Sequence, residues 1–135
     1  MTFRIFLSHS TSDREILDSI KSDLEKGKIE VYVAEDDPKP GFNLSDKVYR
    51  AIESCDAFVV LLTENGQSSG FVNSEIGIAK GAKKLIIPML QIGVTLPTIL
   101  SGVEYVKFEP SNITESTKSL RNFITGLVTI QLSGK

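Results

Sequence analysis

A run of six apolar residues at 57–62 (Ala-Phe-Val-Val-Leu-Leu) has no polar face. A strand that is apolar on both sides is typical of the centre of a parallel sheet, because helices cover both faces of such a sheet. Apolar segments at 3–7, 29–33, 85–90 and 103–108 also have strand character, and amphipathic helical patterns separate the strands along the chain. The alternation predicts an α/β fold with right-handed crossovers between parallel strands.

Five strands in a chain of 135 residues favour the flavodoxin-like arrangement, a parallel sheet in the order 2-1-3-4-5 with helices on both faces. A Ser-x-x-Glu pattern at 12–15 predicts that the first helix begins directly after the first strand. Pro88 lies near the end of the fourth strand, where it removes one ladder hydrogen bond. The last strand, 103–108, is more polar and suits a sheet edge. We expect residues 1–135 to form a single domain.

In this strand order, ligands bind beyond the carboxyl ends of strands one and three. The loops 8–12, 34–45 and 63–74 are predicted to meet there. The first loop holds four hydroxyl side chains before a helix start, an arrangement that suits a phosphate group with help from Arg14. An ordinary strand-to-helix turn with a capping serine explains the same residues.

Glu75 lies near the predicted start of the helix that follows the third loop, with Asn73 as the candidate N-cap. A carboxylate in a first helical turn is stabilised by the helix dipole, so the position alone does not indicate catalysis. The expected place beside the crevice favours a role in ligand binding. Gly77 and Gly81 would let another surface approach this helix, or would pack against the sheet.

Composition excludes several classes of function. A net charge of −2 without a basic cluster argues against nucleic-acid binding. One cysteine, Cys55, and one histidine, His9, allow neither an internal disulfide nor a Cys/His zinc site, and we expect no metal. No apolar run approaches the ~20 residues that span a bilayer, so we expect a cytoplasmic domain without membrane contact. His9 has no Ser-His-Asp pattern around it and is expected on the surface.

Several short segments together resemble the TIR (Toll/interleukin-1 receptor) domain family. The resemblance covers about residues 3–128 in the family's order and spacing. The segments are Phe6-Leu7-Ser8-His9-Ser10 with Asp13 for the first box, Asp36-Asp37 with Pro40-Gly41 for the BB loop, Ile52-Glu53-Ser54 for the second helix, 68–76 for the S-S-x-W-x-x-x-E segment, and Ile86-Ile87-Pro88 for the fourth strand.

The resemblance implies an enzyme for which NAD, or NADP, is the substrate rather than a cofactor. Many TIR domains of bacteria, archaea and plants, and one animal axonal protein, cleave the nicotinamide glycosidic bond of NAD. The family's catalytic glutamate corresponds to Glu75. The implied substrate-binding residues are Ser8, His9, Ser10, Asp36, Phe42 and Phe71. Phe71 stands where the family has tryptophan, and it keeps a stacking face without the indole NH.

One carboxylate is sufficient for this reaction. Ordinary glycosidases need a second carboxyl group to protonate the leaving oxygen, whereas nicotinamide leaves a pyridinium as a neutral molecule. A single carboxylate beside the ribose stabilises the oxocarbenium-like transition state. Attack by water gives ADP-ribose, and attack by an adenine nitrogen gives a cyclic product; the sequence leaves both open. By resemblance, the pathway is defence or stress signalling.

Two other readings compete with the enzyme. The first is a non-catalytic signalling module that associates with itself or with other TIR domains through the BB loop, 34–45, in which Pro38, Pro40 and Phe42 form a stiff surface. The second is a nucleoside deoxyribosyltransferase, which also directs a glutamate at an N-glycosidic bond; the family segments favour the TIR reading. A phosphoacceptor receiver is disfavoured because Ser8 and Thr63 stand where that class needs acids.

Overall fold

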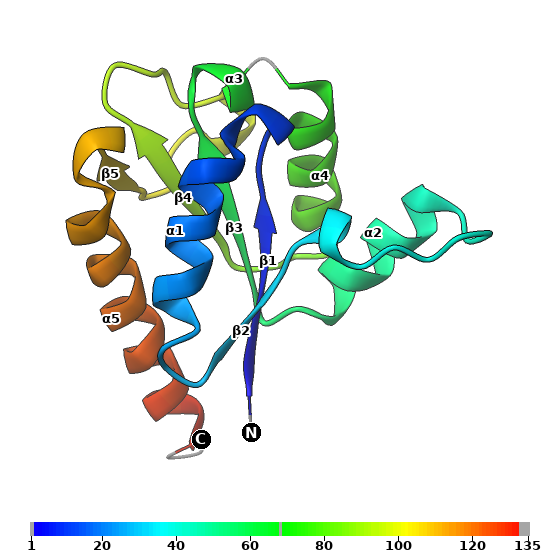
Figure 1. The fold of residues 1–135 in the computed structure, drawn as a ribbon, viewed down its shortest axis with the longest axis horizontal. Helices are drawn as coiled ribbons and strands as arrows, with labels where there is room; N and C mark the ends of the chain where they lie inside the picture. The colour runs from blue at the N-terminus through cyan, green and yellow to red at the C-terminus, as the bar shows by residue number, and fades with distance from the viewer. Residues whose placement is uncertain (1, 68, 133–135) are drawn as a thin grey trace.

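The computed structural model of this protein describes residues 2–67 and 69–132, and its chain forms one five-stranded sheet with helices on both sides (Figure 1). All strand pairs are parallel and the order is β2-β1-β3-β4-β5, which confirms the flavodoxin-like prediction. The strands are β1 Phe3–Ser8, β2 Ile29–Tyr32, β3 Ala57–Leu62, β4 Ile86–Gln91 and β5 Val106–Phe108. The helices are α1 Arg14–Leu24, α2 Leu44–Ser54, α3 Glu64–Gln67, α4 Gly70–Gly81 and α5 Ile113–Leu132.

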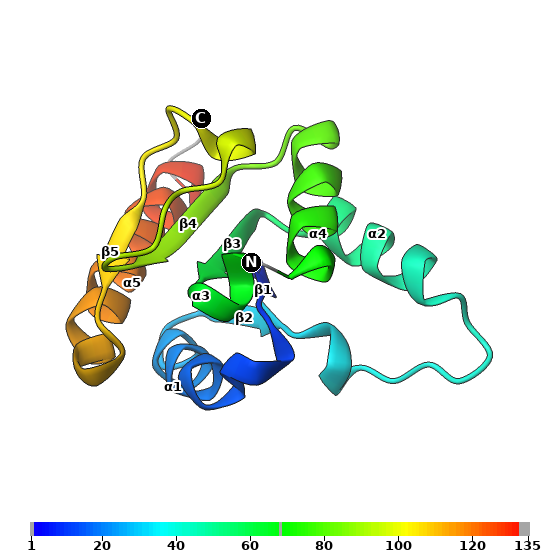
Figure 2. The ribbon, with the colours of Figure 1, turned by 90° about the horizontal axis from the view of Figure 1, so that it is seen from above.

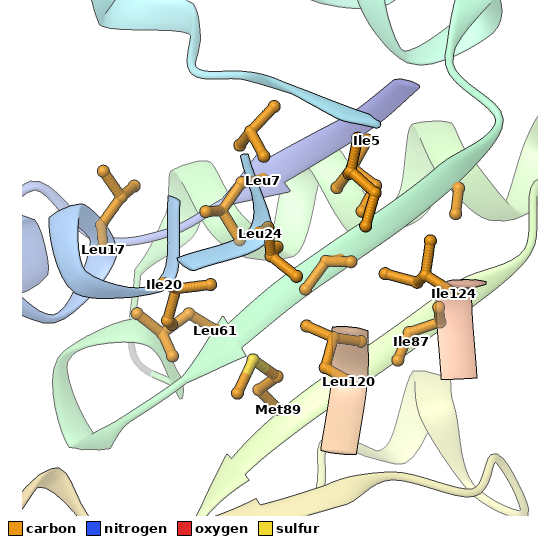
Figure 3. Close-up of a cluster of buried hydrophobic side chains, with 14 of the residues drawn as sticks. Ile5, Leu7, Leu17, Ile20, Leu24, Leu61, Ile87, Met89, Leu120 and Ile124 are labelled. Carbon is orange, nitrogen blue, oxygen red and sulfur yellow. The ribbon is translucent and has the colours of Figure 1, made fainter. Parts of the chain in front are cut away.

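Two helical layers cover the sheet, with α1 and α5 on one face and α2 and α4 on the other (Figure 2). Successive side chains of β3 point to opposite faces of the sheet, and helices cover both faces, so the strand is apolar throughout. Val59 and Leu61 point toward the layer of α1 and α5, where they join Leu17, Ile20 and Leu120 (Figure 3). The alternate residues of β3, namely Phe58, Val60 and Leu62, pack with Val48, Ile52, Val72 and Ile76 of α2 and α4.

The edge strand β5 is shorter than predicted, since it covers residues 106–108 and not 103–108. Its partner β4 explains the difference. Pro88 of β4 has no backbone N–H to donate, and pairing with β5 begins one residue later, at Met89 opposite Val106. The proline therefore limits the ladder on this side of the sheet.

The loop after β2 projects from the body of the protein (Figure 1). A 3-10 turn, η2 (Ala34–Asp36), comes first, and residues 37–43, here called the arm, lead to α2. At its tip, Phe42 N donates to Lys39 O at 3.0 Å, and Gly41 has φ +88°. A proline followed by a glycine with positive φ is the arrangement of a type II turn.

The base of the arm is fixed more firmly than its tip. Lys47 Nζ donates to the carbonyl oxygens of Ala34 and Asp37, both at 2.8 Å. Tyr32 Oη donates to Asp37 Oδ2 at 2.8 Å; burial, together with this carboxylate, raises the pKa of Tyr32 to about 12. The arm therefore leaves the body in a defined direction.

Candidate active site

The loop after β1 differs from the sequence prediction in how it caps the next helix. Residues Thr11–Asp13 form a 3-10 turn, η1, so α1 begins at Arg14 and the Ser-x-x-Glu box at 12–15 is not its start. Ser10 caps this turn instead, because its Oγ accepts from Ser12 N at 3.3 Å. The Ser10 hydroxyl therefore satisfies a backbone N–H of its own loop, as in an ordinary capping turn.

The helix that carries Glu75 begins earlier than predicted. Ser69 is its N-cap, with Oγ accepting from Val72 N at 3.2 Å, and Asn73 is inside the helix. Glu75 thus lies in the second turn, and the first turn has no acidic residue, so the end of the helix dipole contributes less at this position. The buried face of α4 consists of Val72, Glu75, Ile76 and Ala79. The spacing of these four residues along the helix therefore places Glu75 on the same buried face as three apolar residues.

Gly77 and Gly81 do not pack against the sheet. A Cβ built on either residue would meet nothing within 4 Å, and both residues are exposed. The expectation of packing against the sheet is therefore wrong, and approach by another surface stays a prediction.

Glu75 is a buried carboxyl group with a short hydrogen bond to the end of β1. Its side chain belongs to a residue that is 6% exposed, and Ser8 Oγ donates to Oε1 at 2.6 Å. Burial raises the pKa of Glu75 to about 7; the Ser8 hydrogen bond opposes the rise, and the charge of Glu35 adds to it. The carboxyl group is therefore poised to change charge near neutral pH.

A cleft of about 280 Å³ opens in front of Glu75, and we call it the first cleft. It lies beyond the carboxyl end of β1, between the loop that follows β2 and the start of α4, which follows β3. The three loops predicted to meet beyond strands one and three therefore all contribute to its lining. Its floor is apolar, because Phe6 stacks between Tyr32 and Phe58 with ring centroids 5.7 and 5.6 Å apart. The lining residues are Phe6, Leu7, His9, Ser10, Thr11, Ala34, Glu35, Leu44, Lys47, Ser69, Phe71 and Glu75.

A second cleft, of about 290 Å³, shares Leu44, Phe71 and Glu75 with the first. Its other lining residues come from α2 and α4 and are mostly apolar or small: Ser45, Val48, Gly70, Ser74 and Ile78. Glu75 therefore borders two adjoining spaces. If a covalent bond of a ligand lies beside this carboxylate, the groups at its two ends can occupy the two clefts.

His9 is enclosed, which corrects the prediction of a surface position. Its side chain is only 5% exposed. Nδ1 lies 3.3 Å from Leu7 O, and Nε2 lies 3.0 and 3.1 Å from the two carboxylate oxygens of Glu35. The ring thus connects the loop after β1 to η2 and forms part of the wall of the first cleft.

Arg14 binds carboxylates of this protein rather than an open phosphate position. Its guanidinium contacts Asp36 twice at 3.0 Å, Glu35 at 3.3 Å and Asp18 at 3.0 Å. The Arg14 hydrogen bond holds the pKa of Asp36 below its usual range. Arg14, Asp18 and Asp36 line an outer groove with Lys21 and Glu25, outside the first cleft, whereas Glu35 lines the first cleft.

Buried hydrogen bonds hold the loops after β1 and β3 together. Thr63 Oγ1 donates to Asp13 Oδ2 at 2.5 Å and accepts from Gly66 N at 2.9 Å. Asn65 Nδ2 donates to Asp13 Oδ1 at 3.3 Å. A Cβ on Gly66 would lie 2.6 Å from Leu61 O, so the turn requires glycine there. The sequence did not reveal α3, which carries part of this network.

The structure brings together most of the predicted site residues. His9, Ser10, Phe71 and Glu75 line the first cleft, and Ser8 bonds to Glu75. The other two lie elsewhere: Asp36 pairs with Arg14 in the outer groove, and Phe42 is 70% exposed on the arm. Ser68, the first residue of the family segment 68–76, lies outside the described residues.

Sequence reasoning missed Glu35, Leu44 and Lys47 in the wall of the first cleft. Glu35 begins the acidic run 35–37, and that run was the available signal. Lys47 and Leu44 carried none, because their role depends on how the arm leads into α2. Within residues 2–67 and 69–132, no three His, Cys, Asp or Glu side chains gather in a way that could hold a metal ion. The helices of the same ranges include none with the length and apolarity to span a bilayer.

Comparison with known proteins identifies the class. A family model described as TIR domain matches residues 5–122, so this chain belongs to the TIR domain family. A search of curated proteins finds no match.

Several solved structures share the fold at low sequence identity. The TIR domain of a Toll-related receptor from Hydra magnipapillata matches with a TM-score of 0.71 and 21% identity, over 79% of this chain and 85% of that one. A prokaryotic SEFIR domain gives 0.68 and 18%, over 90% and 97%. A CMP N-glycosidase of Clostridium botulinum gives 0.66 and 22%, over 87% and 97%. Such identities establish the shared fold.

Proposed function

We propose that this TIR domain is an N-glycosidase that cleaves the nicotinamide glycosidic bond of NAD or NADP. The observation that carries the proposal is Glu75, a buried carboxyl group that borders two adjoining clefts and is held by Ser8. An N-glycosidic bond at Glu75 would have its base and its ribose on opposite sides. The N-glycosidase activity of the clostridial neighbour concerns the same class of bond and supports the proposal.

The chemistry matches the side chains that are present. As the bond between ribose C1′ and the pyridinium nitrogen breaks, its electron pair moves to the ring, and nicotinamide leaves neutral. Positive charge develops on the ribose, where ionised Glu75 stabilises it at short range in a site of low dielectric. Water then adds to C1′ and loses a proton, which gives ADP-ribose, or an adenine nitrogen adds to give a cyclic product. Phe71 offers an apolar ring at the border of both clefts.

The test is release of nicotinamide from NAD by the purified protein, with all products identified by mass. Glu75→Gln keeps the shape of the side chain and removes its charge, so we expect a loss of about 10³-fold in rate. Glu53→Gln makes the same change on an exposed part of α2 and should leave the rate unaltered. Equal rates in the two variants would refute the assignment of Glu75. Transfer of ribose to an added base, rather than to water, would identify a transferase.

The second candidate function is an interaction module, and the arm favours it. Phe42, at the tip of the arm, and Leu44, at the start of α2, are 70% and 52% exposed, and the arm projects from the body (Figure 1). Exposed aromatic and aliphatic side chains on a projecting segment suit contact with another TIR domain. If wild-type protein releases no nicotinamide at any concentration, association through residues 34–45 becomes the function to test.

A further inference from the structure

We propose that Glu35 is a specificity-determining residue that makes the first cleft selective for an N-glycoside whose base carries a positive charge. The proposal rests on the N-glycosidase function proposed above and adds to it the charge of the substrate's base. Glu35 enters the cleft from η2 after β2, and Glu75 enters it from α4. Two carboxyl groups from distant parts of the chain therefore line one space.

The carboxylate of Glu35 is held in place. His9 Nε2 lies 3.0 Å from one of its oxygens, and Arg14 Nη1 lies 3.3 Å from the other. The His9 ring is itself enclosed and contacts Leu7 O, so it cannot turn freely. A group that is already ordered loses little entropy when a ligand binds.

The surroundings do not neutralise this charge. Arg14 is shared among Asp18, Glu35 and Asp36, so one cation faces three carboxylates. Lys47 also lines the cleft and keeps its positive charge while its Nζ donates to two backbone carbonyl oxygens. Among the described residues that line the cleft or pair with Arg14, the carboxyl groups of Asp18, Glu35, Asp36 and Glu75 still outnumber the cations Arg14 and Lys47.

The state of Glu75 supports the same conclusion. The charge of Glu35 adds to the effect of burial in raising the pKa of Glu75, so the field of Glu35 is felt at that carboxyl group. A field that disfavours a second negative charge favours a positive one in the same space. A cationic base would relieve the repulsion between the two groups, whereas a neutral base would not.

The two carboxylates should act at different stages. The base of NAD is positive before the bond breaks and neutral afterwards, so attraction by Glu35 favours binding of the intact substrate. Glu75 acts on the charge that develops on the ribose. Because the attraction by Glu35 acts mainly before the bond breaks, we expect Glu35→Gln to raise KM without lowering kcat, and Glu75→Gln to lower kcat.

The test compares binding of NAD and NADH, because the reduced ring is neutral in an otherwise similar dinucleotide. The Glu75→Gln protein is titrated with each dinucleotide at low salt and at pH 8. We expect NAD to bind about three- to tenfold more tightly than NADH, the modest range reflecting the 40% exposure of Glu35. Adding Glu35→Gln should bring the ratio to about one.

Asp18→Asn is the matched control in the Glu75→Gln background. It removes one carboxylate from the same Arg14 but lies on α1, outside the first cleft, so the preference for NAD should persist. Equal binding of NAD and NADH, or a preference that survives Glu35→Gln, would overturn the proposal. Nicotinamide release without this preference would refute only the role of Glu35, and absence of release by wild-type protein would refute the proposed function.

Discussion

The loops at the two sides of the candidate site are built in opposite ways. After β1 and β3, Asp13, Thr63 and Gly66 form a buried network that fixes the chain on which Ser8 and Glu75 depend. After β2, the arm is held at its two ends, where Lys47 donates to Asp37 O and Asn43 caps α2, and Phe42 at its tip lies in solvent. The sequence predicted one crevice formed by all three loops, and the lining of the first cleft confirms this. The arm extends beyond that cleft, so the structure adds an exposed region that suits contact to a buried region that suits chemistry.

The difference shows what burial does to a charged group. Glu75 is held where water is excluded, so its ionisation costs free energy and its charge has a strong effect on a bound substrate. Side chains at the tip of the arm lie in solvent, so burial neither raises the cost of a charge there nor strengthens its effect on a substrate. If the two regions differ in this way, changes in the buried region should alter stability and pH dependence, and changes in the arm should alter neither.

The largest expected effect is a gain in stability from Glu75→Gln. The pKa of Glu75 rises from an ordinary 4.5 to about 7 on folding, so the folded state retains its proton while the unfolded state has lost it. Stability from this group is present below 4.5 and is lost as the pH rises through 7, a cost of about 3 kcal/mol at pH 8. Glutamine removes the cost.

Urea unfolding followed by circular dichroism measures this effect, since the protein has no tryptophan. The gain of Glu75→Gln over wild type should grow from about 1 kcal/mol at pH 5 to about 3 kcal/mol at pH 8. Glu53→Gln, on the exposed part of α2, should show no such growth. A constant difference across this pH range would mean that Glu75 titrates normally.

The second effect concerns the network after β3. Gly66→Ala places a Cβ 2.6 Å from Leu61 O, a backbone atom that cannot move easily, and should cost about 1–3 kcal/mol. Gly77→Ala makes the same change on the exposed face of α4, where open space surrounds the added Cβ, and should instead stabilise the protein by about 0.5–1 kcal/mol. Thermal unfolding of both variants gives the comparison. Similar effects from both would show that the turn at Gly66 is not constrained.

The third effect is a change in pH dependence from Ser8→Ala. In wild type, kcat/KM for NAD should rise with pH through about 7, because the ionised form of Glu75 is the active one. The Ser8 hydroxyl favours that form, and its loss should move the midpoint upward by about one pH unit. Ser10→Ala, on the same loop without contact to Glu75, is the control and should keep the wild-type midpoint. A lower midpoint for Ser8→Ala would contradict the role of this hydrogen bond.

Periodicity was enough to predict the sheet but not the ends of its elements. The strand order followed from apolar runs such as 57–62, because a strand buried on both faces can lie only at the centre. The length of β5 depended on Pro88 in a neighbouring strand, which no local pattern of residues 103–108 reveals. The length of a ladder is set by two strands together, and one sequence segment contains only half of that information.

The sequence indicated most of the residues of the candidate site but not how they are arranged. Ser69 and Asn73 are both suitable N-caps, and Ser69 as the N-cap moves Glu75 from the first turn of the helix to the second, where it lies on the buried face of α4. His9 was expected in solvent because its partner Glu35 follows a different strand. The direction of the arm depends on Lys47 and two backbone carbonyls, which no motif records.

The smallest effect on stability is expected from the arm itself. Phe42→Ala removes a ring that is 70% exposed, so the free energy of unfolding should change by less than about 0.5 kcal/mol. The change should appear in association: sedimentation of concentrated protein should show weaker self-association, and nicotinamide release per molecule should lose any dependence on protein concentration. Phe123→Ala, which removes a 52% exposed ring from α5, is the control. Because α5 covers the opposite face of the sheet from α2 and α4 (Figure 2), equal behaviour of the two variants would mean that the arm has no special part in association.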